Sequence, residues 1–159
     1  MILILSASSF LGIFKSRALK RRAEELRGII HAVERIKTGI SFGKKSVPSL
    51  LSEIGKDMCP LFFSVGTSAL GTTVYESYEK VRLDYSSRSF LSDDDQKNVD
   101  IFFSSLGRSG SDDQLALCET TLSRLSGNLL DAEEKYKKYG NVFSRSGILA
   151  GLFIVILFL

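Results

Sequence analysis

Residues 115–139 read LALCETTLSRLSGNLLDAEEKYKKY, and the spacing of their apolar side chains decides the fold. These side chains recur in an unbroken alternation of three and four, at Leu115, Cys118, Leu122, Leu125, Leu129, Ala132, Tyr136 and Tyr139. Because about 3.6 residues complete a helical turn, this period places them along one seam of a helix. The stretch therefore predicts a long helix, about 30 Å or more, packed along another helix.

A matching stripe occurs in the first quarter of the chain. Four of its members recur at intervals of seven, and they are Leu19, Leu26, Val33 and Ile40. Ile29 and Ile36 join the same stripe, three residues after Leu26 and Val33. Shorter helices are predicted near residues 47–57, 60–70, 74–86 and 92–106, and clean period-two alternation is absent. We therefore predict an all-α fold, a helical bundle in which two long helices bracket the shorter ones.

Both ends of the chain are free of charge. All 21 Lys and Arg and all 18 Asp and Glu residues lie between Lys15 and Arg145, leaving residues 1–14 and 146–159 uncharged. The basic residues that flank these ends are Lys15, Arg17, Lys20, Arg21, Arg22, Lys138 and Arg145. Both groups of basic residues lie between an uncharged end and the central part of the chain. The positive-inside tendency would therefore place the central part in the cytoplasm.

This pattern predicts three regions: an N-terminal membrane segment at 1–14, a cytoplasmic helical domain at 15–141 and a C-terminal transmembrane segment at 142–159. A helix over the first region is about 21 Å long, against a hydrocarbon core of about 30 Å, while the last region reaches roughly 27 Å. A spanning, re-entrant or interfacial placement of the first region stays open. Two buried core helices are the alternative to membrane segments.

Composition excludes some classes of partner. The net charge of +3 is small, and no basic stripe with interleaved aromatic residues is present, so we expect no nucleic-acid partner. The basic residues gather beside the apolar ends, where anionic lipid headgroups would lie. Cys59 and Cys118 fall in the expected cytoplasmic domain, where thiols stay reduced, so no disulfide is expected.

Side chains that could carry chemistry do not assemble into a recognisable site. Residues 39–46, GISFGKKS, are similar to a phosphate-binding loop, but three residues separate the glycines where four are needed. His31 has no second imidazole or cysteine at ligand spacing. The three aspartates at 93–95 follow Ser92 and fit the first turn of a helix. We expect no catalytic residue, no cofactor and no metal.

Residues 105–114, SLGRSGSDDQ, precede the long C-terminal helix and predict a corner between two helices. Gly107 suits the left-handed position that closes a helix. Ser111 and Gln114 have the spacing of a capping box, and the two aspartates between them fall in the positive first turn of the next helix. These capping roles account for most of the residue types in the corner.

Three groups of residues follow a family pattern. In the first long helix they are an arginine, spaced aliphatic residues and an aromatic–glycine end: Leu26, Arg27, Ile29, Val33, Ile36, Ile40, Phe42 and Gly43. At the corner they are Leu106, Gly107, Arg108 and Gln114. Before the closing aliphatic run they are Lys138, Tyr139, Gly147, Gly151 and Leu152. In this order and spacing, the chain resembles the stage III sporulation protein AB family of endospore-forming bacteria.

The resemblance implies a non-enzymatic, membrane-anchored structural subunit of the channel complex that links mother cell and forespore. The helical domain is similar to the cytoplasmic domain of the inner-membrane platform proteins of type II secretion and type IV pilus machines. The implied location is the mother-cell membrane facing the forespore. The implied partners are a cytoplasmic ATPase (stage III sporulation protein AA), other membrane subunits of the channel complex and membrane lipid.

The resemblance also marks two candidate contact sites. The candidate docking corner comprises Leu106, Gly107, Arg108, Asp112, Asp113 and Gln114, and the candidate helix-end motif comprises Phe42 and Gly43. Gly107 and Gln114 would fix the shape of the corner, while Arg108 and Asp112 would offer exposed charge. A corner that only caps helices is the alternative. A generic membrane-tethered helical adaptor of a secretion or pilus system, a small lipid-modifying enzyme, and self-association through the Leu/Tyr seam also stay open.

Overall fold

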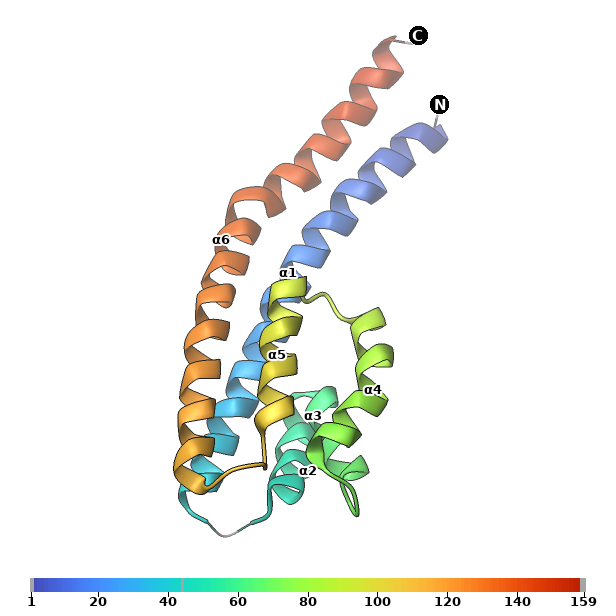
Figure 1. The fold of residues 1–159 in the computed structure, drawn as a ribbon. Helices are drawn as coiled ribbons and strands as arrows, with labels where there is room; N and C mark the ends of the chain where they lie inside the picture. Colours follow the sequence, from blue (N-terminus) through green and yellow to red (C-terminus); the bar gives the residue numbers. More distant parts are fainter. Residues whose placement is uncertain (1, 44, 158–159) are drawn as a thin grey trace. The chain divides into compact units, whose positions relative to one another are not determined.

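A computed structural model of the chain describes the backbone of residues 2–43 and 45–157 and the side chains of residues 14–43 and 45–139 (Figure 1). Over these residues the chain is all-helical. The six helices are α1 (Ile2–Ser41), α2 (Val47–Met58), α3 (Pro60–Ser68), α4 (Val74–Arg88), α5 (Asp93–Ser105) and α6 (Ser111–Leu157). Two long helices bracket four short ones, which confirms the predicted helical bundle and the positions of the short helices.

The chain divides into two compact units. Unit 1 comprises Met1–Ala23 and Leu130–Leu159, and unit 2 comprises Glu24–Leu129. Unit 2 contains all four short helices together with the parts of α1 and α6 that fall within it. Within unit 2, the α1–α2 loop, the α3–α4 loop and the α5–α6 corner lie at the same end (Figure 1).

Aromatic side chains from three helices fill the centre of unit 2. The ring of Phe62 lies 5.0 Å from that of Phe103 and 6.0 Å from that of Phe102, measured between centroids. Tyr78 of α4 stacks on Phe103 at 4.5 Å, and its hydroxyl donates a hydrogen bond to the Asp100 carboxylate. Such ring pairs add about 0.5–1.5 kcal/mol each beyond their buried area, so this cluster holds α3, α4 and α5 together.

The predicted stripe of α1 is confirmed in its central part. Its members that are at most 1% exposed are Leu26, Ile29, Val33 and Ile36. Leu19 and Ile40, at the two ends of the stripe, are half-buried. The buried side chains recur at the helical period, so the C-terminal half of α1 presents one continuous apolar face to the core of unit 2.

The predicted seam of α6 is right for its first six positions and wrong for its last two. Cys118, Leu125 and Ala132 are at most 1% exposed. The half-buried members are Leu115, Leu122 and Leu129. Tyr136 and Tyr139, by contrast, are 37% and 40% exposed. Both tyrosines lie in unit 1, whose described residues belong to α1 and α6, and a pair of helices leaves part of each helix surface exposed.

Helices α2 and α3 meet backbone to backbone. A Cβ atom added to Gly55 would lie 2.1 Å from the backbone nitrogen of Phe63, and one added to Gly66 would lie 2.2 Å from that of Ser52. Both glycines are buried. Only a hydrogen in place of a side chain permits this approach, so the two glycines together set the distance between α2 and α3.

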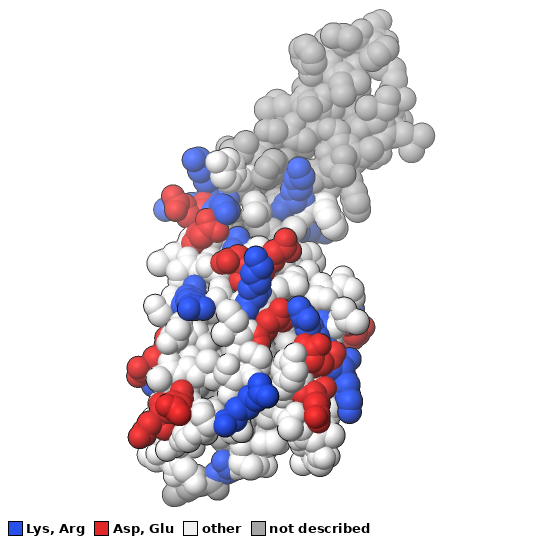
Figure 2. Space-filling model, viewed as in Figure 1, with Lys and Arg blue, Asp and Glu red and all other residues white. Residues whose placement is uncertain are grey.

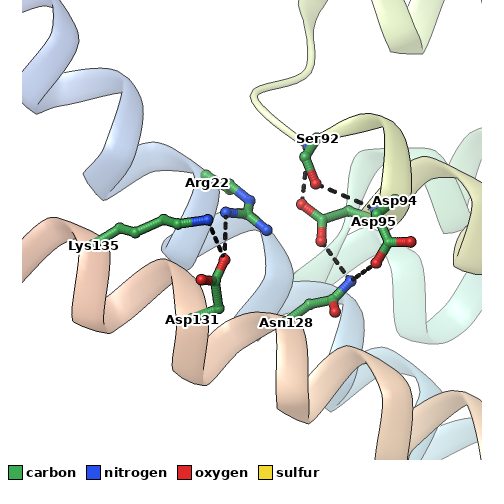
Figure 3. Close-up of polar contacts among 7 residues, drawn as sticks. All are labelled: Arg22, Ser92, Asp94, Asp95, Asn128, Asp131 and Lys135. Carbon is green, nitrogen blue, oxygen red and sulfur yellow. Dashed lines mark hydrogen bonds and ion pairs between the residues drawn. The ribbon is translucent and has the colours of Figure 1, made fainter.

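The aspartates at the start of α5 form a helix N-terminus, as predicted. The Ser92 hydroxyl accepts from the Asp95 backbone N–H at 3.3 Å, and the Asp95 carboxylate accepts from the Ser92 N–H at 2.9 Å, which completes a capping box. The Asn128 amide of α6 donates to Asp94 at 3.1 Å and to the buried Asp95 at 2.8 Å (Figure 3). These carboxylates therefore cap α5 and tie it to α6.

The predicted membrane segments at 1–14 and 142–159 lie outside the residues whose side chains are described, apart from Phe14, which is 57% exposed. Within the described part of the chain, no helix has the length and apolarity needed to cross a bilayer.

Candidate functional site

The α5–α6 corner has the backbone that its glycine predicts. Helix α5 ends at Ser105, and the Leu106 N–H donates to the Phe102 carbonyl at 2.9 Å. Gly107 follows with φ of 80°, in the left-handed region that L residues with a side chain rarely adopt. Leu106 is 1% exposed and anchors this turn in the core of unit 2.

Gln114 braces the corner from inside. Its side chain is buried, and its Oε1 accepts from the Gly107 N–H at 2.9 Å. Its Nε2 donates to the Ser109 hydroxyl at 2.9 Å and to the Ser105 carbonyl at 3.4 Å. The predicted capping box between Ser111 and Gln114 is wrong, because Gln114 reaches back to the loop instead. Gln114 thus links Ser105, Gly107 and Ser109 of the loop through its side chain.

Arg108 is exposed but held in place. Its guanidinium donates to the Ser104 carbonyl at 3.1 Å and lies 6.0 Å from the centre of the Tyr75 ring, over its face. Tyr75 itself is 39% exposed on the first turn of α4. A guanidinium stacked on an aromatic ring keeps its charge while losing side-chain freedom, so the pair presents a pre-ordered cation.

A pocket of about 420 Å³ opens beside this pair. It is lined from the start of α2, the start of α4 and the corner, by Val47, Pro48, Thr72, Thr73, Val74, Tyr75, Glu76, Leu106, Gly107 and Arg108. Val74 and Leu106 are buried and give it an apolar floor. The Glu76 carboxylate is engaged by the Thr73 N–H at 3.3 Å in the α4 capping box. The pocket thus combines apolar residues with one cation, Arg108, and one carboxylate, Glu76.

The structure brings together four of the six residues of the predicted docking corner. Leu106, Gly107 and Arg108 line the pocket, and Gln114 supports it from behind. Asp112 and Asp113 are exposed in the first turn of α6, as predicted, but do not line the pocket. The residues that α2 and α4 contribute were missed, because they lie some 30 to 60 residues away in sequence and no motif links them to the corner.

The candidate helix-end motif closes α1. The helix ends at Ser41, the Phe42 N–H donates to the Thr38 carbonyl at 3.2 Å, and Gly43 has φ of 60°. The Phe42 side chain is 71% exposed and borders a second pocket of about 290 Å³ between α1 and α2. A helix C-terminus presents carbonyl oxygens, which do not favour a phosphate anion.

One of the predicted basic flanking residues, Arg22, shares a carboxylate with Lys135. The Asp131 carboxylate of α6 accepts from Arg22 of α1 at 3.2 Å and from Lys135 at 2.9 Å (Figure 3). The hydrogen bond from Lys135, followed by that from Arg22, holds the pKa of Asp131 below its usual range. Of the other predicted flanking residues, Lys15, Arg17, Lys20, Arg21 and Lys138 are exposed, and Arg145 lies outside the described side chains.

The remaining reactive side chains form no catalytic arrangement in the part of the chain that the structure describes. Burial raises the pKa of the Cys59 and Cys118 thiols to about 11, so neither is a thiolate near neutral pH. His31 pairs only with Glu34, its Nδ1 lying 3.2 Å from the carboxylate, and both side chains are exposed. No group of three His, Cys, Asp or Glu side chains stands at metal-binding distances among the described residues.

Charge is divided unevenly between the two units. Unit 1 has nine Lys and Arg against three Asp and Glu, whereas unit 2 has twelve against fifteen. On the visible face of unit 2, cations and anions are interspersed without a patch of one sign (Figure 2). Unit 2 is therefore mildly acidic overall, and the basic character of the chain resides in unit 1.

Comparisons with known proteins agree with the fold and the motifs. A family model described as stage III sporulation protein AB matches residues 1–159. A solved structure titled stage III sporulation protein AB aligns with a TM-score of 0.67 at 16% sequence identity, covering 73% of this chain and 96% of that chain. At that identity the likeness shows the fold. No curated protein matches the chain.

Proposed function

The chain belongs to the stage III sporulation protein AB family, and we propose that it is a non-enzymatic, membrane-anchored platform subunit of the mother cell–forespore channel complex. In this role unit 2 binds a cytoplasmic ATPase, stage III sporulation protein AA, while the ends of the chain hold it at the mother-cell membrane that faces the forespore. Other membrane subunits of the complex are its further partners. The observation that carries the docking part of this proposal is the pocket at the α5–α6 corner.

The chemistry of the corner suits a protein partner. Tyr and Arg are enriched among the residues that dominate binding energy at interfaces, and here they form a pre-ordered pair at the rim of a pocket. An apolar side chain of the partner would fill the floor at Val74 and Leu106, and a neighbouring carboxylate would bind Arg108. Because Gln114 fixes the loop, little ordering entropy is lost on binding.

The membrane part of the proposal is supported by the sequence of the two ends. Residues 1–14 and 146–159 are free of charge, and the basic residues that follow the first and precede the second belong to unit 1. Basic residues on the unit 2 side of both ends favour a topology in which unit 2 is cytoplasmic. The uncharged ends then enter the membrane from the same side.

A pull-down from native membranes tests the docking proposal. The full-length tagged chain is recovered from detergent-solubilised membranes of sporulating cells, and its partners are identified by mass spectrometry. We expect the sporulation ATPase and the channel-complex subunits with the unmodified chain. Arg108→Glu should reduce ATPase recovery by about ten-fold or more, because it reverses a charge at the centre of the proposed contact. Arg124→Glu, the same change at an exposed position of α6, should leave recovery unchanged.

Two results would contradict the proposal in different ways. Equal ATPase recovery with Arg108→Glu and Arg124→Glu would show that the corner is not the docking surface. Recovery of secretion or pilus components in place of the sporulation subunits would replace the platform role with that of a generic membrane-tethered adaptor.

A further inference from the structure

Unit 1 concentrates positive charge in two adjacent helical segments. Residues 15–22 of α1 contain five cations and no anion, and residues 131–138 of α6 contain three of each sign. We call the eight cations the basic collar, and they are Lys15, Arg17, Lys20, Arg21, Arg22, Lys135, Lys137 and Lys138. The Asp131 carboxylate joins the two segments by accepting from Arg22 and Lys135. Within these two segments the eight cations outnumber the three carboxylates, so the net charge is positive.

The basic collar extends round more than half of the α1 circumference instead of forming a narrow patch. Apart from half-buried Arg22, all of its members are exposed. When the five cations of α1 are projected down the helix axis at about 100° per residue, they cover an arc of about 220°, with Lys20 at one end and Lys15 at the other. A folded protein partner contacts one face of a helix, whereas a layer of lipid headgroups contacts it from every exposed side. The distribution therefore favours a layer over a single protein surface.

The length of the basic segment and the neighbouring aromatic residues suit the membrane interface. The basic segment of α1 is about 10 Å long, of the same order as the roughly 5–8 Å that each interfacial layer occupies. Tyr136 and Tyr139 lie among the basic residues of α6 with 37% and 40% of their surface exposed, and Lys138 stands 5.2 Å from the centre of the Tyr139 ring. Exposed tyrosines beside basic residues are typical of membrane interfaces.

We propose that the basic collar is a binding surface for anionic phospholipid headgroups and that it enriches such lipids around unit 1. This inference rests on the membrane placement proposed above and adds the class of lipid. Headgroup phosphates accept hydrogen bonds from Lys and Arg, and each such residue near an anionic surface adds to the attraction. The acidic balance of unit 2 opposes its own approach to the same surface.

Fluorescence quenching in vesicles tests the lipid preference. The chain contains no tryptophan, so Tyr136→Trp places a single fluorophore within the basic collar. The full-length chain is reconstituted in mixed phosphatidylglycerol–phosphatidylcholine vesicles in which one lipid class at a time carries bromine near its headgroup. At equal mole fractions, quenching by the brominated anionic lipid should exceed that by the brominated zwitterionic lipid about three-fold or more.

Two matched sets of Gln substitutions distinguish the effect of the collar position from the effect of the net charge of the chain. Replacing four exposed collar residues with Gln should bring the ratio close to one, and these are Arg17, Lys20, Lys137 and Lys138. Replacing four exposed cations of unit 2 with Gln changes the net charge equally and should leave the ratio unchanged, and these are Lys56, Lys80, Lys97 and Arg124.

The outcomes distinguish this inference from the proposed function. Equal quenching by both brominated lipids would overturn the lipid preference while leaving the membrane placement intact. Absence of quenching by either lipid would overturn the membrane placement and the inference together. A ratio of one accompanied by salt-sensitive capture of an acidic channel subunit on the collar would assign this surface to a protein.

Discussion

At the scale of single residues, the tightest constraints in unit 2 are at Gly55 of α2, which lies against the Phe63 backbone, and at Gly66 of α3, which lies against the Ser52 backbone. The atoms that a new Cβ would meet are backbone atoms, which cannot move away as the end of a flexible side chain can. Accommodation therefore requires the helices to separate, and separation disturbs Leu51 and Phe62, both fully buried.

We expect Gly55→Ala and Gly66→Ala each to lower the free energy of unfolding by about 2–3 kcal/mol, despite the better helix propensity of alanine. Gly127→Ala is the matched control, since Gly127 lies exposed within α6 with open space at its Cβ position. That change should stabilise the chain by about 1 kcal/mol. Urea denaturation followed by circular dichroism measures all three, and a neutral effect of Gly55→Ala would contradict the close contact.

Gln114 supports a second prediction at this scale. Gln114→Ala removes the acceptor of the Gly107 N–H and a donor to the Ser105 carbonyl, and we expect a loss of about 1–3 kcal/mol in unfolding free energy. Gln114→Glu retains the acceptor, so its loss should be smaller. Asp113→Asn, at an exposed position on the same turn of α6, should stay within about 0.5 kcal/mol of the unmodified chain. Equal stability of all variants in the same denaturation experiment would show that the Gln114 hydrogen bonds do not contribute to the free energy of unfolding.

At the scale of helices, the link between α4 and α5 depends on a residue of α1. Glu25 accepts from the Tyr85 hydroxyl, from the Ser89 hydroxyl at 2.7 Å and from the Phe90 N–H at 2.9 Å. Burial, with the hydrogen bond to Glu25, raises the pKa of Tyr85 well above its usual range. One carboxylate thus fixes the end of α4 and the whole turn into α5.

Removing this carboxylate should loosen the turn without unfolding unit 2. With Glu25→Ala, hydrogen exchange of the backbone amides in residues 85–91 should accelerate about ten-fold or more, because three hydrogen bonds to the turn are lost. The core of α5 should exchange as before. Glu34→Ala, an exposed change on the same helix, should alter none of these rates. Hydrogen exchange measured by mass spectrometry distinguishes residues 85–91 from the core of α5. Uniform acceleration across unit 2 would point to global destabilisation instead.

Sequence patterns predicted the helices well because each boundary has a local cause. The stripe from Leu26 to Ile36, the glycine that ends α5 and the aspartates that start it act within a few residues of one another. The pocket was beyond such patterns, since Tyr75 and Arg108 meet only through the packing of α4 on α5. Tyr136 was misassigned because the three-and-four period continues into unit 1, where a pair of helices leaves part of each helix surface exposed.

At the scale of the whole molecule, buried neutral acids make stability sensitive to high pH. Burial raises the pKa of Cys59 from 9.0 to about 11, and burial with the hydrogen bond to Asp100 raises that of Tyr78 beyond its usual range. These groups therefore release their protons at a higher pH in the folded chain than in the unfolded chain. Their full contribution to the free energy of unfolding is present below pH 9 and declines above it.

We expect the free energy of unfolding to be nearly constant from pH 7 to 8.5 and to fall between pH 9 and 11, with Cys59 contributing about 2 kcal/mol of the loss. Cys59→Ala should be less stable at pH 7 but should show a shallower decline over this interval. Urea titrations at half-unit steps of pH measure both slopes. An identical slope in the variant would show that Cys59 titrates normally in the folded chain.

The corner pocket is assembled from three segments that are far apart in the sequence, namely the start of α2, the start of α4 with the loop before it, and the α5–α6 corner. Insertions and substitutions in loops leave helix packing largely untouched. The specificity of the pocket can therefore diverge during evolution, one segment at a time, without a new fold having to arise. Related chains that share this architecture would then accept different partners. Co-variation between the three segments would indicate a shared partner better than conservation within any one of them.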